Sequence, residues 1–179
     1  YGNGKLSDYS VRSVESVENV LANPERYLQQ ADTYYFYEFD KWEKTGNKPL
    51  RAINVIRENL LHDGNGNIAP ETHFKINLAY IDGFGRILQS KQKVEPGKAI
   101  KRTAGQGVEL NADGSPVEAW ADERWLVSGH VVYNNKQQPV RQYEPFFSPI
   151  VEFENDETLK AYGVAAHTHY DAVGRELRI

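Results

Sequence analysis

The sequence predicts a mainly β fold, in which consecutive antiparallel hairpins form a curved sheet and one short helix lies near the N-terminus. Three observations predict it. A turn signature recurs along the chain, in which Asp or Asn is followed three residues later by Gly. Apolar and aromatic runs flank its copies. The chain also contains 11 Tyr, 7 Phe and 3 Trp, residue types that favour strands.

The turn signature has a specific physical meaning. An Asp or Asn side chain at the first position accepts a hydrogen bond from the backbone two residues on. Gly at the fourth position adopts the left-handed conformation that closes a type I turn with a bulge. In the two clearest copies an Arg takes the fifth position: Asp82, Gly85 and Arg86 in one, and Asp171, Gly174 and Arg175 in the other. Weaker copies begin at Asp63 (with Gly66), Asn111 and Asn134. A fixed repeat of hairpins is therefore expected.

Composition limits the classes of function. The formal charge of −4 over 179 residues gives no reason to expect a nucleic-acid partner or direct membrane insertion. There is no Cys, so disulfides are excluded. There is also no Met, and the chain begins at Tyr1. We interpret the sequence as an excised segment of a larger protein, with a processed N-terminus as the alternative.

The N-terminal third combines short helices with strands. Residues 1–23 are predicted to be a lead-in segment, part helical, because Val and Leu recur there at near-helical spacing. Pro24 follows a capping Asn and predicts a short helix over residues 24–31. The aromatic run at 33–39 is the strongest strand signal, with Tyr35, Tyr37 and Phe39 on one face. Residues 44–48 are a predicted turn, and residues 50–60 form a strand or, because alternation is imperfect, a helix.

The rest of the chain, within a predicted repeat domain at 24–179, is expected to alternate strands and turns. Strands are predicted at 72–81, 87–94, 124–133 and 139–143, with an extended segment at 144–149, an acidic loop at 152–157 and a last hairpin at 165–179. Residues 95–123 interrupt the series as an irregular insertion with at most one small hairpin, at Asp113.

Three landmarks in this order resemble a known family: residues 80–90 around Asp82, residues 124–129 with Tyr133 and 139–146, and residues 168–176 around Asp171. Together they resemble the Rhs/YD-repeat region of the B component of bacterial Tc insecticidal toxin complexes, which is related to the SpvB-like toxin proteins. A single Tyr-Asp-x-x-Gly-Arg motif is a weak signal, but the Trp–Ser–Gly–Tyr–Pro–Val–Tyr–Pro–Phe series is far more specific. Gln137 and Gln138 depart from the pattern, where Gly and Arg are expected.

The resemblance implies a structural role rather than an enzyme. In that family the repeats form a spiralling β-sheet that encloses a toxic C-terminal polypeptide. The expected partners are therefore the remainder of the B component, the C component and the enclosed toxin, in a secreted, extracellular complex. No catalytic residue, metal or cofactor is expected in this segment.

Two other functions stay open. A carbohydrate-binding β module would use surface aromatics such as Tyr35 and Trp125. A metal-dependent hydrolase would use His167, His169 and Asp171, which share a face if extended and are of types that ligate zinc, although Asp171 already has a turn role.

Charged residues outside the turns have simpler interpretations. The carboxylate pairs Glu38/Asp40 and Glu152/Glu154 lack a predicted cleft and are expected to be solvated. The basic run from Arg86 to Arg102, which includes Lys91 and Lys93, is expected to be a solvated strand edge.

Overall fold

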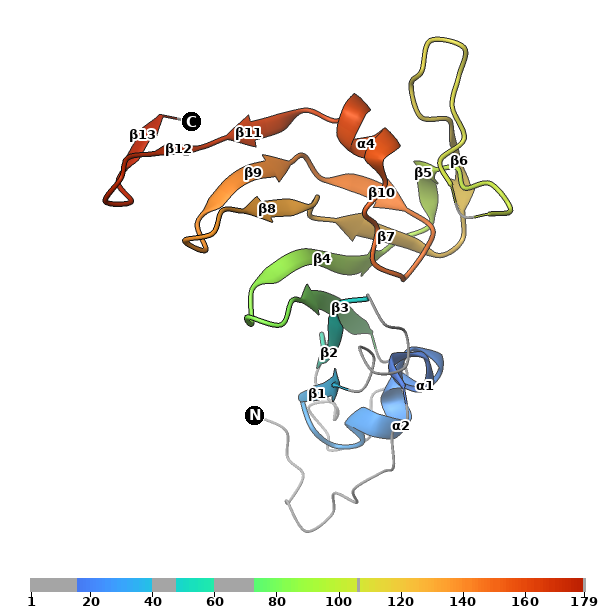
Figure 1. Ribbon diagram of the computed structural model, residues 1–179. Helices are drawn as coiled ribbons and strands as arrows, with labels where there is room; N and C mark the ends of the chain where they lie inside the picture. Colours follow the sequence, from blue (N-terminus) through green and yellow to red (C-terminus); the bar gives the residue numbers. More distant parts are fainter. Residues whose placement is uncertain (1–15, 40–47, 60–72, 106, 179) are drawn as a thin grey trace. The chain divides into compact units, whose positions relative to one another are not determined.

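The computed structural model describes residues 16–39, 48–59, 73–105 and 107–178 (Figure 1). It confirms a mainly β fold with antiparallel sheets and short helices. The chain divides into two compact units, residues 1–79 and 80–179. The turns predicted at 44–48 and at Asp63–Gly66 fall wholly or mostly outside the described residues.

Unit 1 contains two short helices and three strands. The elements are α1 (Val17–Ala22), α2 (Pro24–Leu28), β1 (Thr33–Glu38), β2 (Leu50–Arg57) and β3 (Phe74–Ile81), the last of which ends in unit 2. Ser16 and Asn19 form a capping box that starts α1. The predicted helix at 24–31 is present as α2, with Pro24 at its start.

Strand β2 decides how unit 1 packs. It pairs with β1 in antiparallel register, with Tyr35 opposite Asn54, and the helical alternative for 50–60 is wrong. Burial alternates along β2, so that Ile53 and Val55 are buried with Val17 and Val20 of α1 in the core. This alternation is the period of two that a half-buried strand requires.

Unit 2 contains ten strands and one helix among its described residues. They are β4 (Ile87–Val94), β5 (Gly97–Ile100), β6 (Glu118–Ala121), β7 (Arg124–Val127), β8 (Val131–Tyr133), β9 (Pro139–Tyr143), β10 (Phe146–Ser148), α4 (Glu157–Tyr162), β11 (Ala165–His167), β12 (His169–Tyr170) and β13 (Glu176–Arg178). Strands β4, β7 and β10 are neighbours in that order, β8, β9 and β11 form a second sheet, and β12 pairs with β13 (Figure 1).

The strand predicted at 124–133 is two strands in the structure, β7 and β8. Gly129 separates β7 from β8 and has a φ of +79°. A Cβ atom there would lie 2.2 Å from the carbonyl oxygen of Tyr143. Only glycine fits so close an approach in a left-handed conformation, and the chain turns from one sheet into the next at this point.

The insertion at 95–123 is more ordered than predicted. Strands β5 and β6 pair in antiparallel register. Isolated bridges join Arg102 to Val108 and Leu110 to Pro116. The predicted turn near Asp113 is present, and it lies between the bridged residues Leu110 and Pro116, beside the separate bridge of Arg102 to Val108. Helix α4, directly after the predicted acidic loop, was also missed.

Candidate functional site

The turns at Asp82 and Asp171 share one geometry. Oδ1 of Asp82 accepts from the backbone N–H groups of Phe84 (2.9 Å) and Arg86 (3.0 Å), while Oδ2 accepts from Nε of Arg86 at 2.6 Å. Oδ1 of Asp171 accepts from the N–H groups two and four residues on, at 3.0 and 2.8 Å, and Oδ2 from Nε of Arg175 at 2.7 Å. Each aspartate thus joins both ends of its own turn.

The carboxylates of these turns are held ionised. For Asp82, partial burial raises the pKa, but hydrogen bonds from the backbone and side chain of Arg86 outweigh it and the pKa is lowered. For Asp171, hydrogen bonds from the backbone and side chain of Arg175 lower the pKa. Accepting several N–H donors favours the charged form of a carboxyl group.

The Asn134 turn is an uncharged version of the same structure. Oδ1 of Asn134 accepts from the N–H groups of Lys136 (2.9 Å) and Gln138 (3.0 Å). Nδ2 of Asn134 donates to Oε1 of Gln138 at 3.2 Å, where the other turns have an Asp–Arg pair. Gln137 occupies the glycine position with a φ of +65°. The two departures noted in the sequence therefore keep the turn and remove its charge.

The fourth turn, at Asn111, closes differently. Gly114 has a φ of +83°, as the signature predicts. The N–H of Ser115, however, donates to Oδ1 of Asp113 at 2.9 Å rather than to Asn111, and Nδ2 of Asn111 donates to Oγ of Ser115. The backbone turn is retained with a different side-chain acceptor.

Tyrosines join three of the turns in unit 2, the Asn134 turn to the Asp82 turn and the Asp171 turn to the Asn134 turn. The hydroxyl of Tyr133 donates to the carbonyl oxygen of Ile87 at 2.9 Å, and the guanidinium of Arg86 lies 4.6 Å from the centre of the Tyr133 ring. The hydroxyl of Tyr170 donates to the carbonyl oxygen of Pro139 at 3.0 Å. Each tyrosine stands directly before the Asx residue that opens its turn, so the Tyr–Asx pair links one turn to the previous one.

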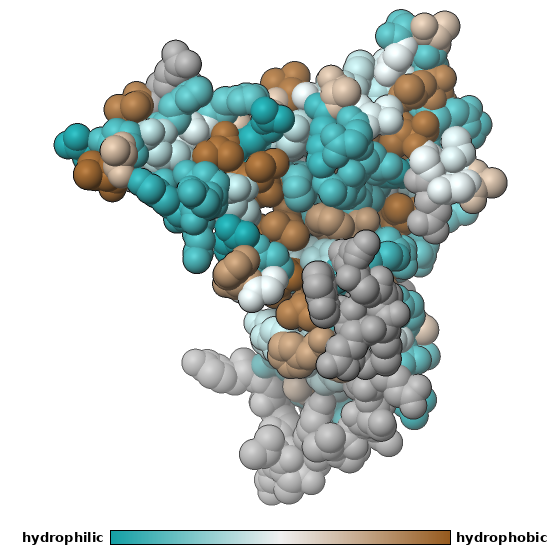
Figure 2. Space-filling model, in the orientation of Figure 1, coloured by the Kyte–Doolittle hydropathy of each residue, from teal (hydrophilic) through white to brown (hydrophobic). Residues whose placement is uncertain are grey.

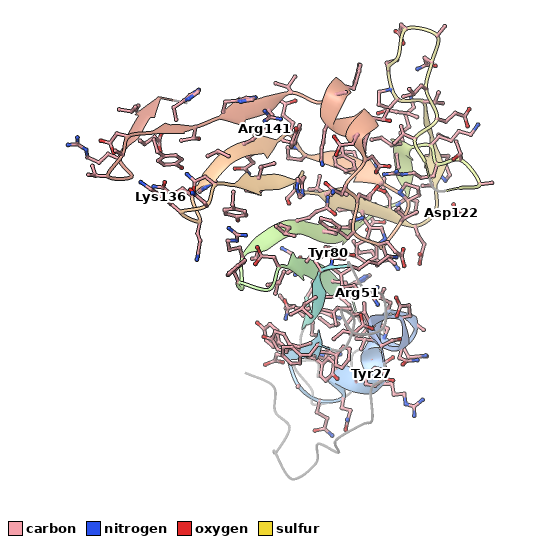
Figure 3. All side chains as sticks on the ribbon, viewed as in Figure 1. Tyr27, Arg51, Tyr80, Asp122, Lys136 and Arg141 are labelled. Carbon is pink, nitrogen blue, oxygen red and sulfur yellow. The ribbon has the colours of Figure 1, made fainter. Side chains whose placement is uncertain are left out.

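Two more side chains join the Asn134 turn to the Asp171 turn. Nζ of Lys136, which Figure 3 labels at the end of the β8–β9 hairpin, donates to the carbonyl oxygen of Ala172 at 2.5 Å. Nε2 of Gln138 donates to the carbonyl oxygen of Gly174 at 2.9 Å. The turn residues thus serve as inter-hairpin contacts as well as hairpin closures.

A buried ion-pair cluster, defined here as Lys91, Arg102, Glu154 and Asp156, lies in unit 2. Nζ of Lys91 pairs with Oε2 of Glu154 and donates to the carbonyl oxygens of Ile150 (3.0 Å) and Glu152 (2.6 Å). Arg102 pairs with the other carboxylate oxygen of Glu154 and, at 2.9 Å, with Asp156.

Neutral side chains complete the hydrogen bonding of Glu154. The hydroxyl of Ser148 donates to its carboxylate at 2.7 Å, and Gln89 bonds both its backbone N–H and its carbonyl oxygen. Lys91 and Glu154 are 1% and 4% exposed. Burial lowers the pKa of Lys91, and Arg102 acts in the same direction, while Glu154 opposes them. The cluster fixes residues 150–156 onto β4.

The cluster corrects two predictions from the sequence. Lys91 and Arg102 are not part of a solvated edge, because β4 pairs with β7 and its Lys91 points inward. Glu154 is not a solvated loop carboxylate. In unit 1, Glu38 is also buried and pairs with Arg51 at 2.6 Å; Asp40 lies outside the described residues. The alternation of apolar and polar residues along the strands did not identify these buried ion pairs, because charged side chains there occupy positions that face the core.

A pocket of about 850 Å³ adjoins the cluster. Residues of α4, β10 and the insertion line it, together with residues between the strands, and its ionisable side chains include His130, Glu144, Asp156 and Lys160. Nδ1 of His130 is buried and has no hydrogen-bond partner among the described residues. Burial and the charge of Lys160 lower the pKa of His130, against the opposing effect of Glu157. The lining mixes acidic, basic and aromatic groups, and no nucleophile–base pair is evident among the described residues.

In unit 1, Arg51 connects β2 to both β1 and α1. It pairs with Glu18 at 2.7 Å as well as with Glu38. Partial burial raises the pKa of Glu18, but the hydrogen bond and the charge of Arg51 prevail and lower it to about 2. Arg51 is labelled in Figure 3.

The aromatic residues divide into exposed and buried groups. Tyr35, Tyr37 and Phe39 are 59%, 49% and 71% exposed, and the rings of Tyr37 and Phe39 stack with their centres 5.7 Å apart. They share a face, as predicted, but they are not core residues. Trp125 is 1% exposed, which contradicts the sugar-binding role that the alternative function would give it.

The residues of the alternative metal site, His167, His169 and Asp171, are not assembled into a ligand set. No group of three or more His, Asp or Glu side chains that could hold a metal occurs in the part of the chain that the structure describes. The carboxylate of Asp171 is engaged within its own turn. Across the described ranges, no helix is long and apolar enough to cross a membrane. Figure 2 shows hydrophilic residues over much of the visible surface of unit 2, with hydrophobic ones scattered among them.

The structure is similar to solved structures of Tc toxin complexes. The crystal structure of TcdB2-TccC3 matches 97% of this chain with a TM-score of 0.74 and 24% identity, and the match covers 8% of that chain. The crystal structure of TcdB2-TccC3-TEV matches 73% of this chain and 6% of that chain, with 29% identity and a TM-score of 0.56. A Photorhabdus luminescens Tc holotoxin pore matches 78% of this chain and 7% of that chain, with 25% identity and a TM-score of 0.57. The sequence matches no model of a known protein family and no curated protein. The resemblance to Tc toxin proteins, first seen in the turn motifs, is thus confirmed by structural similarity.

Proposed function

We propose that this chain is a segment of the β-sheet wall of a Tc-type shell, which encloses a toxic polypeptide and performs no catalysis itself. The similarity to TcdB2-TccC3 over 97% of the chain supports it most. The linked turns supply the physical means: the Asn134 turn is bonded to the Asp82 turn and to the Asp171 turn, and these bonds give partners to backbone carbonyl groups within the wall. The partners would be the remainder of the B component, the C component and the enclosed toxin, in a secreted complex.

The test is protease protection in the full-length product of the gene that encodes this segment, assembled with its C component. We expect the toxic polypeptide to resist trypsin in the intact complex and to be digested after Lys91→Met, which removes a buried ion pair of the wall. Lys93→Met is the matched control, because Lys93 lies on the same strand in a half-exposed pair with Glu123. A toxin polypeptide digested in the intact complex as fast as free toxin would exclude the shell role.

A carbohydrate-binding module remains the second candidate, because the exposed row of Tyr35, Tyr37 and Phe39 offers rings to a sugar face. Glycan-array binding by the chain, lost in Tyr35→Ala and in Tyr37→Ala, would support it. Tyr162→Ala is the matched control, because Tyr162 is an exposed tyrosine on α4. Tyr27 would not serve, because it is buried. Absence of binding to any glycan would remove this candidate.

The absence of catalysis is part of the proposal and needs its own test. A metal-dependent hydrolase would retain zinc or a similar ion through purification, held by His167, His169 and a third ligand. We expect elemental analysis of the purified chain to find less than one zinc or similar metal ion per chain. A stoichiometric ion lost in His169→Ala would overturn a purely structural role.

A further inference from the structure

We propose that a pocket on the sheet of β8, β9 and β11 binds a carboxylate of an acidic polypeptide segment, with Arg141 of β9 as the main ligand and His167 of β11 beside it. The pocket has a volume of about 430 Å³, and the residues that line it all belong to unit 2. The inference goes beyond the shell role proposed above and does not depend on it, because it concerns a binding site of this chain alone.

The register of the sheet places the two basic side chains together. Arg141 lies opposite His167 on one neighbouring strand and opposite Val132 on the other. Directly opposite residues of antiparallel strands share a face, with their Cβ atoms about 4.5–5.5 Å apart. The side chains of Arg141, which Figure 3 labels, and of His167 are exposed, and both residues line the pocket. His169 also lines it and adds a second imidazole.

The guanidinium of Arg141 is held in place but carries no ion pair. Its Nη1 donates to the hydroxyl of Tyr143 at 3.1 Å, and Tyr143 is buried. No carboxylate in the described part of the chain forms an ion pair with Arg141, and Asp171, the acidic residue of the adjoining turn, is bonded to Arg175. When the His167 ring is protonated, two like charges stand directly opposite each other, which is unfavourable. A carboxylate between them would replace that repulsion by attraction.

The donors at this pocket suit a carboxylate better than a phosphate. Phosphate sites commonly use backbone N–H groups in addition to side chains. Here the N–H of Thr168 donates to the carbonyl oxygen of Val140 at 3.1 Å, so it is not available to a ligand. The donors that remain are the guanidinium fork and the imidazoles. A guanidinium fork matches the two oxygens of a carboxylate in a bidentate pair.

The apolar residues of the pocket indicate that the carboxylate belongs to a polypeptide. Val132 and Val140 line the same pocket and offer apolar surface to the methylene groups of a glutamate side chain. The acidic residues Glu154 and Asp156 of this chain are already engaged in the buried ion-pair cluster. The occupant is therefore a glutamate-containing segment of another polypeptide, with an apolar residue beside the glutamate.

The test is an NMR titration of the intact 179-residue chain with the blocked peptide Gly-Glu-Val-Glu-Gly. We expect the Nε–H of Arg141 and the backbone amides of Arg141 and His167 to shift at millimolar peptide and low ionic strength. The matched peptide Gly-Gln-Val-Gln-Gly should bind about tenfold more weakly, because it lacks the charge that strengthens the hydrogen bonds. The shifts should disappear at about 1 M salt, where the screening length falls to about 3 Å.

Protein variants assign the binding to Arg141. Arg141→Ala should weaken binding of the glutamate peptide about tenfold, and Arg141→Lys, which keeps the charge without the fork, should give an intermediate affinity. Arg26→Ala, at an exposed arginine of α2, is the matched control and should leave binding unchanged. Unshifted resonances outside the pocket would show that each variant is folded.

Four results would overturn the inference. They are equal binding of the two peptides, unchanged binding in Arg141→Ala, no shift at millimolar peptide, and inorganic phosphate shifting the same resonances at lower concentration than the peptide. Shifts at Arg141 that follow the concentration of the chain alone would identify a second copy as the occupant and would equally overturn it. Protease protection in the full complex is measured independently, so failure of the proposed function would be recognised separately.

Discussion

Replacing Lys91 by methionine tests how much the buried ion-pair cluster contributes to stability. Methionine keeps most of the volume of the side chain and removes its charge. The variant loses the pair with Glu154 and the hydrogen bonds to the carbonyl oxygens of Ile150 and Glu152. Removing one partner of a buried pair typically costs about 3–5 kcal/mol, because the other charge stays buried.

The expected cost lies at the lower end of that range. Glu154 keeps Arg102 and Ser148 as partners, so its carboxylate is not left alone. We expect the free energy of unfolding to fall by about 3 kcal/mol, and Tm by about 6–12 °C for a chain of this size. Urea unfolding followed by tryptophan fluorescence reports on unit 2 through the buried Trp125.

Two comparisons make the result interpretable. Lys93→Met should cost about 0–1 kcal/mol, as for other exposed pairs. The double variant Lys91→Met with Glu154→Gln should lose less than the sum of the two single losses, since each residue compensates the charge of the other. A Lys91→Met variant within about 1 kcal/mol of the parent chain would refute the reasoning, because such a value is that of a solvated pair.

Three further predictions concern single positions. Gln137→Gly should stabilise the chain by about 1 kcal/mol, because a left-handed φ costs a non-glycine residue about that much; a chevron or urea curve would measure it, and a loss of stability would contradict it. Gly129→Ala should destabilise unit 2 by several kcal/mol, since a Cβ would meet the Tyr143 carbonyl at 2.2 Å; unchanged stability would exclude that close approach. The folded-state pKa of Glu18 is lowered from 4.5 to about 2, so its contribution is complete above pH 4.5 and is lost as the pH falls toward 2. Because Glu18 is half-exposed, we expect its contribution to the free energy of unfolding to be about 1 kcal/mol. In Glu18→Gln the free energy of unfolding should vary less with pH across that window.

The sequence was a good guide wherever local chemistry decides the structure. The turns at Asp82 and Asp171 depend on side chains within five residues, and both form as their signature predicts. Strands β1 and β4 follow from short apolar or β-favouring runs, and their observed bounds, Thr33–Glu38 and Ile87–Val94, agree closely with the predictions. Pro24 was also a sufficient signal for α2.

The sequence was a poor guide where distant residues decide the structure. Lys91 and Glu154 are 63 positions apart, and nothing near either residue indicates a buried partner. Gly129 divides the strand predicted at 124–133 because the Tyr143 carbonyl approaches it, which is likewise a long-range contact. A weak signal did exist for the tyrosine junctions, since Tyr precedes the Asx residue at both Asn134 and Asp171, but their acceptors become visible only when the turns lie side by side.

The separation between Lys91 and residues 150–156 has a consequence for how the protein is made. Contacts between distant positions form slowly, since a long loop must close first. During synthesis β4 is therefore complete well before Glu154 leaves the ribosome. In that interval Lys91 stays hydrated, and a charged lysine on an unfinished strand opposes pairing with strands of neighbouring nascent chains. We expect the same ammonium group that later secures the folded unit to delay aggregation until its partner arrives.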